Sequence, residues 1–262
     1  MHSLQTVSKK SLNDCDPFCK GIPVPAGAIG EVSTKPEWRQ KGLATKLLNM
    51  AVEWMRSHRV PVSILLTGEQ ATFYSKIGWI NTLTKYALLD LEMSYGEVNE
   101  TDTHDVFSCT KVDLNVNHHV RAVLADMHKR YCENQKVTGA IARHLSYWEK
   151  WIPTETLRHN AGGMIIATRP GEQDPCAFMI AHFFNDTKTN TTVLRVKEFI
   201  PHTQELIRDG GRSAFAALIK YHVSSLNYEK GNTVPVKISA QHADLMKLRS
   251  DDVITAVLGT YM

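Results

Sequence analysis

The chain has 262 residues, 43% of them hydrophobic and 22% charged, which are ordinary values for a globular protein with a buried core. Its 30 Lys and Arg residues against 27 Asp and Glu give a formal net charge of +3, too mild to indicate nucleic acid or an anionic membrane as partner. No apolar run approaches the length of a membrane span, and Met1 to Lys10 has no apolar core of signal-peptide length. We therefore expect a protein of the cytoplasm or the nucleus, with one large domain or two modest ones.

The five cysteines are odd in number and scattered, which predicts reduced thiols in a reducing compartment. Cys15 and Cys19 are close, but no Cys or His follows them at zinc-site spacing. The histidines show no metal-binding spacing either. We therefore expect no metal site.

The first third of the chain predicts a strand, a turn, a helix, a second strand and a short helix, in that order. Residues 1–24 are polar and are expected to form a loop or a frayed lead-in, and the β-prone run Gly27 to Thr34 then ends before Pro36. From Arg39 onward, apolar residues recur at helical spacing, which indicates an amphipathic helix. They are Leu43, Leu47, Met50, Ala51, Trp54 and Met55.

A buried strand over Val62 to Leu66 follows this helix. A short helix through Phe73 and Tyr74 is then expected to end at Gly78, a residue suited to a helix C-cap. Residues 79–93 are expected to be extended.

The remainder of the chain predicts an α+β domain behind a polar, acidic linker. We place a first domain at 1–94, the linker at 95–116 and a second domain at 117–262. The second domain is predicted to contain both helices and strands. They are helices over 118–133 and 138–151, strands over 163–168, 176–184 and 191–200, a helix through Phe215, Leu218 and Tyr221 that starts near Gly210-Gly211, and short strands over 234–239 and 252–262.

The turn at the start of the first helix, Arg39-Gln40-Lys41-Gly42-Leu43-Ala44, has the chemistry of a pyrophosphate-binding site. A helix N-terminus leaves its first amide N–H groups unpaired and has a partial positive charge. Small residues at Gly42 and Ala44 let a phosphate approach the backbone, and Arg39 and Lys41 add positive charge.

This turn lies between a β-run and a helix, and the segment Phe73-Tyr74-Ser75-Lys76-Ile77-Gly78-Trp79 follows one strand later. The combination resembles the GNAT acetyltransferase superfamily, in which a Q/R-x-x-G-x-G/A turn binds coenzyme A and an aromatic segment closes the site. The resemblance implies a GNAT fold of mixed α/β character and acetyl-coenzyme A as cosubstrate.

The resemblance also implies roles for individual residues. The backbone at Val32 and Thr34 would bind the pantetheine arm. The pyrophosphate would be bound by the backbone amides of Arg39, Gln40, Lys41, Gly42, Leu43, Ala44 and Thr45. Tyr74 would protonate the departing thiolate, and Glu31 is the candidate carboxylate for accepting the amine proton.

Each of these side chains also has a purely structural interpretation. Tyr74 could pack on the core as a helix aromatic, and a core role is favoured for Phe73 and Trp79. A solvated edge-strand carboxylate is the favoured interpretation of Glu31. Arg39 and Lys41 could be a solvated helix start.

A complete GNAT domain has a strand, two helices and two more strands before its cofactor strand, so this chain resembles an N-terminally shortened member. The second half, with Arg143, Trp148 and the run Leu194 to Phe199, resembles the degenerate second GNAT-like domain of two families. These are the fungal lysine N6-acetyltransferases and the enhanced intracellular survival acetyltransferases. The second half has no turn comparable to 39–44, so we expect it to bind no cofactor.

The favoured function is therefore acetyl transfer from acetyl-coenzyme A to a primary amine by direct attack. A small molecule such as lysine is the first candidate acceptor, and a peptide or protein amine is the second. The alternative is a non-catalytic coenzyme A-binding or scaffold protein. The oligomeric state is left open by the sequence.

Overall fold

The computed structural model describes residues 16–65, 67, 70–81, 87–94, 106–137, 140–157, 162–186, 191–224 and 233–240. Its contacts divide the chain into two units. The first unit is Met1–Leu83 with Cys132–His144, and the second unit is Thr84–Tyr131 with Leu145–Met262. The strand predicted over 252–262 lies outside the described residues.

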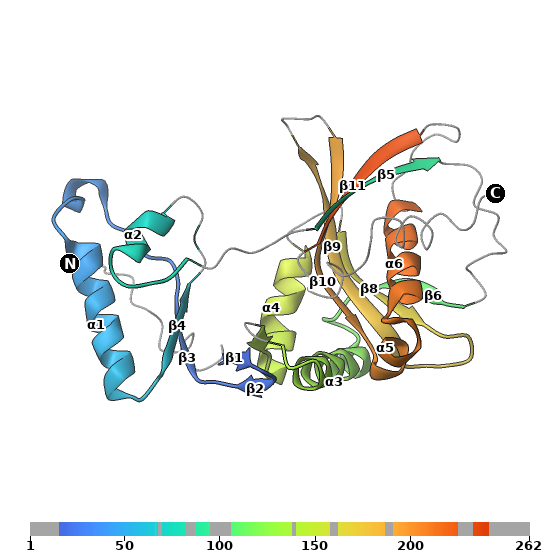
Figure 1. The fold of residues 1–262 in the computed structure, drawn as a ribbon, viewed down its shortest axis with the longest axis horizontal. Coiled ribbons are helices and arrows are strands. Elements are labelled where there is room, and N and C mark those ends of the chain that lie inside the picture. Colours follow the sequence, from blue (N-terminus) through green and yellow to red (C-terminus); the bar gives the residue numbers. More distant parts are fainter. Residues whose placement is uncertain are drawn as a thin grey trace. The chain divides into compact units, whose positions relative to one another are not determined.

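The centre of the first unit is a strand–helix–strand crossover (Figure 1). β3 (Ala26–Ile29) pairs in parallel with β4 (Val62–Leu65), and α1 (Leu43–Ser57) connects them after the short 3-10 helix η1 (Pro36–Trp38). α1 packs so closely on β3 that a Cβ on Gly27 would lie 2.2 Å from the Met55 sulfur. A side chain at position 27 would therefore displace the Met55 side chain.

The core of the first unit is small. Ile29, Leu48 and Met55 form its buried cluster. α2 (Ala71–Ser75) and the turn after it cover this cluster with half-buried apolar side chains. These are Phe73, Tyr74, Ile77 and Trp79. The predicted core role of Phe73 and Trp79 is confirmed.

A three-stranded sheet also belongs to the first unit. β1 (Asp16–Cys19) pairs antiparallel with β2 (Ile22–Pro23) and with β7 (Ile141–Ala142). Two sequence predictions were wrong here. Residues 16–24 contain strands rather than loop alone, and the helix predicted over 138–151 begins only at Leu145 as α4 (Leu145–Leu157), because 141–142 pair with β1.

The second unit is a six-stranded sheet in the order β5-β11-β10-β9-β8-β6 (Figure 1). β10 and β11 are parallel and the other neighbours are antiparallel. Six strands make up this sheet. They are β5 (Ala87–Ser94), β6 (Ser108–Val112), β8 (Gly162–Thr168), β9 (Pro175–Asp186), β10 (Thr191–Pro201) and β11 (Thr233–Ala240).

Helices cover both faces of this sheet (Figure 1). α6 (Arg212–Ser224), preceded by α5 (Thr203–Asp209), packs on one face over β8, β9 and β10. On the other face lies α4, whose fully buried Trp148 meets Phe178 of β9 edge to face at 5.9 Å. α3 (His118–Asn134) lies beside α4, since the rings of His128 and Trp148 are 6.0 Å apart.

The contacts divide the chain earlier than the sequence does. β5 lies within the predicted first domain of residues 1–94 but belongs to the second unit, because it pairs along its whole length with β11. The predicted linker 95–116 contains β6, an edge strand of the same sheet. None of the helices within the described ranges is long and apolar enough to span a bilayer.

Candidate functional site

The turn before α1 has the backbone geometry that an anion-binding helix start requires. Gln40 and Gly42 have positive φ angles of 61° and 71°, with Lys41 between them. Alternation of left-handed and other residues directs successive amides to one side, as in backbone nests that bind anions. Gly42 is the N-cap of α1, and no side chain caps the helix. The amides of Leu43, Ala44 and Thr45 therefore have no intrahelical acceptor and point toward the turn.

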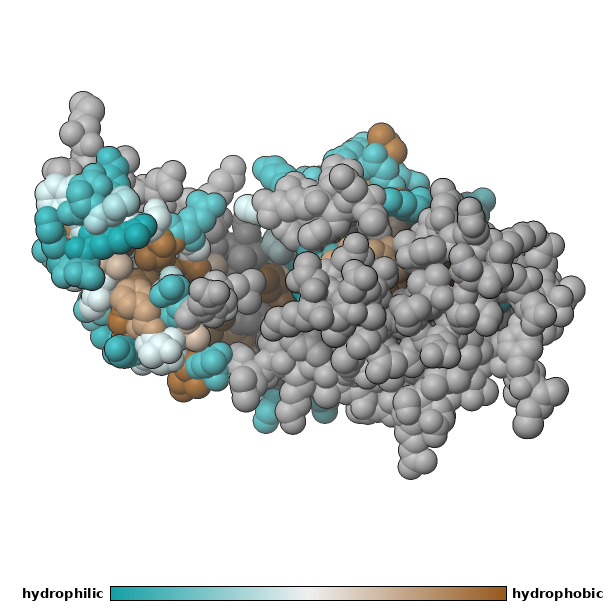
Figure 2. All heavy atoms as spheres, turned by 90° about the horizontal axis from the view of Figure 1, so that it is seen from above, coloured by the Kyte–Doolittle hydropathy of each residue, from teal (hydrophilic) through white to brown (hydrophobic). Residues whose placement is uncertain are grey.

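The space at this turn suits a phosphate group. A Cβ on Gly42 would meet no atom within 4 Å, so an anion can approach the backbone there. Residues 35–43 are all exposed, and hydrophilic residues gather at this end of the first unit (Figure 2). The residues present therefore fit the pyrophosphate of coenzyme A.

The two basic side chains of the turn are each held by a neighbour. Arg39 Nε donates a hydrogen bond to the Thr34 carbonyl oxygen at 3.2 Å, which closes the loop between β3 and α1. The Lys41 ammonium lies 4.4 Å from the centroid of the Trp38 ring, a cation–π contact. Both side chains remain exposed and contribute positive charge next to the uncapped helix.

The chain leaves β3 earlier than its β-propensity predicts. The predicted strand over 27–34 ends at Ile29, and Glu31 has a positive φ of 54°. Val32 and Thr34, the predicted pantetheine contacts, thus follow the strand instead of lying within it. Val32 packs on the first unit's core. Glu31 is exposed beyond the end of the strand, so its predicted strand position was wrong.

Tyr74 packs on the first unit's core, as its structural interpretation expects. Its ring meets Phe73 at 5.1 Å and Trp79 at 6.2 Å, both edge to face. The side chain is half-buried against the first unit's core. Among the described residues its hydroxyl has no hydrogen-bond partner. The ring is therefore packed against aromatic neighbours, and none of the described residues engages its hydroxyl.

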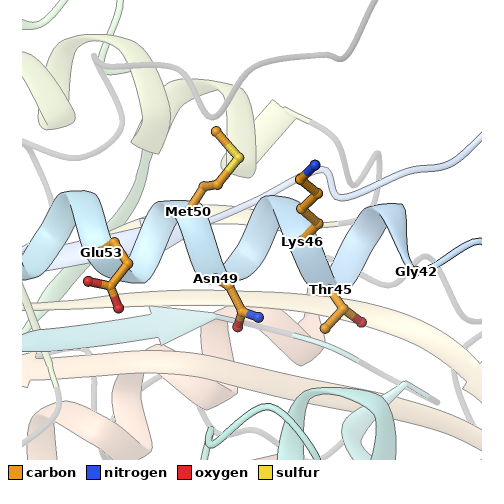
Figure 3. Close-up of a pocket in the computed structure, with 6 residues that line it drawn as sticks. All are labelled: Gly42, Thr45, Lys46, Asn49, Met50 and Glu53. Carbon is orange, nitrogen blue, oxygen red and sulfur yellow. The ribbon is translucent and has the colours of Figure 1, made fainter.

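An open groove of about 670 Å³ runs along α1 from the turn (Figure 3). It is lined by Gly42, Thr45, Lys46, Asn49, Met50 and Glu53. Thr45, Asn49 and Glu53 form one row of the helix, and Lys46 and Met50 form the neighbouring row (Figure 3). The groove thus extends the helix start with hydrogen-bonding groups and one cation. The lining residues beyond Thr45 are not identified from the sequence. Lys46, Asn49 and Glu53 have only a polar place on the helix as their signal, whereas Met50, predicted on the apolar face, is 62% exposed and lines the groove.

A second residue missed by the sequence analysis is Ser63 of β4. Its hydroxyl accepts a hydrogen bond from the Trp79 indole at 3.2 Å and donates one to the Gly27 carbonyl oxygen at 3.2 Å. The only available signal was a serine within an apolar strand. Across the described ranges, no group of three or more metal-ligating side chains could hold an ion.

Residues 4–81 match the model of the acetyltransferase (GNAT) domain family. The structure is similar to a GCN5-related N-acetyltransferase from Kribbella flavida, with TM-score 0.52 and 16% identity over 86% of this chain and 48% of that one. A GCN5-related N-acetyltransferase from Anabaena variabilis gives a TM-score of 0.54 and 17% identity, over 89% of this chain and 54% of that one. Eis1 from Mycobacterium abscessus gives a TM-score of 0.51 and 16% identity, over 86% of this chain and 51% of that one.

The chain thus spans about half the length of these proteins. No curated protein sequence matches it. The similarity to Eis1 agrees with the predicted resemblance to the enhanced intracellular survival enzymes, whereas the resemblance to fungal lysine N6-acetyltransferases stays a prediction. The chain has the GNAT fold, and its first part matches the GNAT acetyltransferase domain family over residues 4–81.

Proposed function

We propose that this chain transfers an acetyl group from acetyl-coenzyme A to a primary amine by direct attack. The observation behind the proposal is the uncapped start of α1, with left-handed Gln40 and Gly42 and open space above the glycine. An unpaired, positively polarised helix start is a ready anion site, and it lies within the segment that matches the GNAT domain.

In the proposed reaction, acetyl-coenzyme A supplies an activated acetyl thioester. The amides of residues 39–45 bind the pyrophosphate, and the backbone at Val32 and Thr34 binds the pantetheine arm. The amine nitrogen attacks the carbonyl carbon, the carbon–sulfur bond breaks, and Tyr74 gives its proton to the departing thiolate. Glu31, exposed and close in sequence to β3, is the proposed acceptor of the amine proton.

A small amine such as lysine is the proposed acceptor, ahead of a peptide or protein amine, on the strength of the resemblance to fungal lysine acetyltransferases. We assign the cofactor site to the first unit alone. In the second unit, the start of α6 is already occupied, because Asp209 accepts hydrogen bonds from the Gly211 and Ser213 amides at 2.9 and 2.8 Å.

The test combines binding and turnover. Coenzyme A at 100 times its dissociation constant should stabilise the protein by about 2.7 kcal/mol, measured by thermal unfolding. Acetyl-coenzyme A consumption is then followed with lysine, other small amines and lysine-containing peptides. Tyr74→Phe should lower kcat by about 100-fold and leave coenzyme A affinity unchanged, whereas Tyr147→Phe, a tyrosine change in the second unit, should alter neither.

The outcomes separate the two functions considered. Stabilisation without turnover of any amine would support a non-catalytic coenzyme A-binding protein and reject the enzyme. The absence of stabilisation would reject both. Full activity in Tyr74→Phe would leave acetyl transfer standing but remove the tyrosine from it.

A further inference from the structure

A chain of side-chain hydrogen bonds ties the segment after α2 to both strands of the crossover. The Trp79 indole N–H donates to Ser63 Oγ of β4 at 3.2 Å, and Ser63 Oγ donates to the Gly27 carbonyl oxygen of β3 at 3.2 Å. Gly27 and Ser63 are register partners in the parallel pair. We call this arrangement the Trp79–Ser63–Gly27 link. Through it, the position of Trp79 depends on the pairing of β3 with β4.

Trp79 in turn defines the surroundings of Tyr74. The Trp79 backbone N–H donates to the Tyr74 carbonyl oxygen at 3.2 Å, and the two rings meet edge to face at 6.2 Å. Phe73 meets the same tyrosine ring at 5.1 Å. Phe73 and Trp79 thus pack against the tyrosine ring from two neighbouring positions.

Ser63 is a polar residue in an otherwise apolar strand, β4. It is half-buried between the apolar residues Val62 and Ile64 in a strand, where a hydroxyl without partners is costly. The link uses this hydroxyl twice, once as acceptor and once as donor. An alanine would fill nearly the same space, so the serine contributes the connection to Trp79 rather than volume.

We infer that Ser63 and Trp79 are positioning residues for the proton donor of the proposed reaction. They hold the Tyr74 ring at a fixed place relative to β3, the strand that precedes the coenzyme A turn. The inference rests on the proposed function of Tyr74. The tyrosine protonates the thiolate only if its hydroxyl lies within hydrogen-bond reach of the sulfur, and Ser63 and Trp79 restrict where that hydroxyl can be.

The first test compares three serine variants. Ser63→Ala removes the link without adding volume and should lower kcat about tenfold, with the KM for acetyl-coenzyme A unchanged, since the turn at 39–45 is untouched. Ser63→Thr keeps a hydroxyl at the same place and should restore kcat. The control is Ser75→Ala, because Ser75 lies next to Tyr74 in sequence but its hydroxyl donates to the Ala71 carbonyl oxygen within α2.

A second measurement reports on Tyr74 without any turnover. The protein is labelled with 3-fluorotyrosine, and Tyr74→Phe identifies the Tyr74 signal in the ¹⁹F NMR spectrum. Ser63→Ala and Trp79→Phe should shift or broaden this signal, whereas Ser75→Ala should leave it in place. Urea unfolding of each variant confirms that it is folded under the conditions of the measurement.

An unchanged Tyr74 signal in folded Ser63→Ala would overturn the inference, whatever the enzyme assay shows. A shifted signal with unchanged kcat would also overturn it, because the link would then hold the ring without serving the reaction. A wild-type protein that neither binds coenzyme A nor acetylates any amine would reject the proposed function and, with it, the catalytic purpose of the link. A loss of coenzyme A affinity in Ser63→Ala equal to the loss in kcat would indicate general distortion of the first unit, and it would contradict the positioning role.

Discussion

The two units each contain a helix that follows a left-handed glycine, α1 after Gly42 and α6 after Gly211, with φ angles of 71° and 80°. At the start of α6, the Asp209 carboxylate accepts hydrogen bonds from the Gly211 and Ser213 amides. At the start of α1, no side chain caps the helix. The first amides of α6 thus bind the chain's own carboxylate, whereas those of α1 are left for an external anion. The two turns also differ in backbone, because left-handed Gly210 and Gly211 are adjacent while Lys41 separates left-handed Gln40 from Gly42.

The space beside the two glycines differs as well. A Cβ on Gly211 would lie 2.9 Å from Pro201, whereas a Cβ on Gly42 would meet no atom within 4 Å. Residues from the sheet therefore close the α6 turn from outside. The comparison shows that a left-handed glycine before a helix does not define an anion site by itself, since the residues around it decide whether the amides are available.

The buried apolar clusters of the two units differ in size. The second unit's main cluster combines α6 with several strands, while the first unit's cluster rests on Ile29, Leu48 and Met55. The buried polar residues of the described chain also belong to the second unit. They are His128, His182, Glu205 and His222. Within the described residues, the unit with the open helix start thus has the smaller buried cluster.

The largest effect is expected when the α1 turn is given the acidic cap of α6. Gln40 stands three residues before the first residue of α1, as Asp209 does before α6. Gln40→Asp should raise the dissociation constant of coenzyme A about 100-fold, equivalent to about 2.7 kcal/mol, because the carboxylate takes up the free amides and repels the pyrophosphate. Isothermal titration calorimetry measures the change.

Gln40→Asn is the matched control for this variant. Asn and Asp both adopt left-handed backbone and both cap helices, so only the charge differs between the two variants. Equal losses of affinity in both would show that capping rather than charge excludes the ligand. Full affinity in both would place coenzyme A away from this turn.

A pH effect of about 2 kcal/mol is expected in the second unit between pH 6.5 and 5. Burial, with a smaller contribution from the Lys111 charge, lowers the pKa of His222 from 6.5 to about 3. His222 therefore stays neutral in the folded state while the unfolded chain takes up a proton below about pH 6.5. The stability is complete above that pH and falls by about 1.4 kcal/mol per pH unit on acidification toward 3.

Urea unfolding at several pH values measures this effect, with His222→Leu as the comparison because leucine cannot titrate. The unfolding free energy of the wild-type protein should fall relative to that of the leucine variant as the pH falls from 6.5 to 5. A difference that is independent of pH would show that His222 has the same pKa in the folded and unfolded states, and it would contradict the lowering of that pKa by burial.

Local patterns were enough to predict much of this fold from the sequence. The amphipathic spacing from Leu43 to Met55 gave α1, and the apolar runs of the second half gave β8, β9 and β10. Pairing could not be predicted in this way. β7 consists of Ile141 and Ala142 alone and exists because β1 lies beside it, so the pattern around it indicated a helix instead.

In the candidate site, too, local patterns could be predicted from the sequence and contacts between distant residues could not. Glycine and basic residues before a helix predicted the turn at 39–44. The early end of β3 was not predicted. The run after Gly30 has β-prone residues, but Glu31 adopts a positive φ that ends the strand geometry, and its residue type does not indicate this. Ser63 and Trp79 are far apart in sequence, and their hydrogen bond depends on the register of β4 against β3. A single sequence contains no signal for that register.

The open space at the α1 turn is tested by filling it. Gly42→Ala places a Cβ where the anion is expected, at a φ of 71° that costs an alanine about 1–2 kcal/mol. Coenzyme A affinity should fall about tenfold, or about 1.4 kcal/mol. Gly171→Ala is the control, because Gly171 has a φ of 79° and open space in the second unit. It should lose similar stability and no affinity, and an equal loss of affinity in both variants would contradict a local role for Gly42.

The smallest effect is expected when the α6 turn is opened instead. Asp209→Ala removes the carboxylate cap and should lower the unfolding free energy by about 1 kcal/mol, while Asp209→Asn should retain most of it. Neither variant should bind a second coenzyme A, because Pro201 still lies 2.9 Å from the Cβ position of Gly211. A second binding event in the calorimetric titration of Asp209→Ala would show that the acidic cap alone separates the two helix starts. One binding event in every variant would show that the shape of the α6 turn, as well as its charge, prevents coenzyme A from binding there.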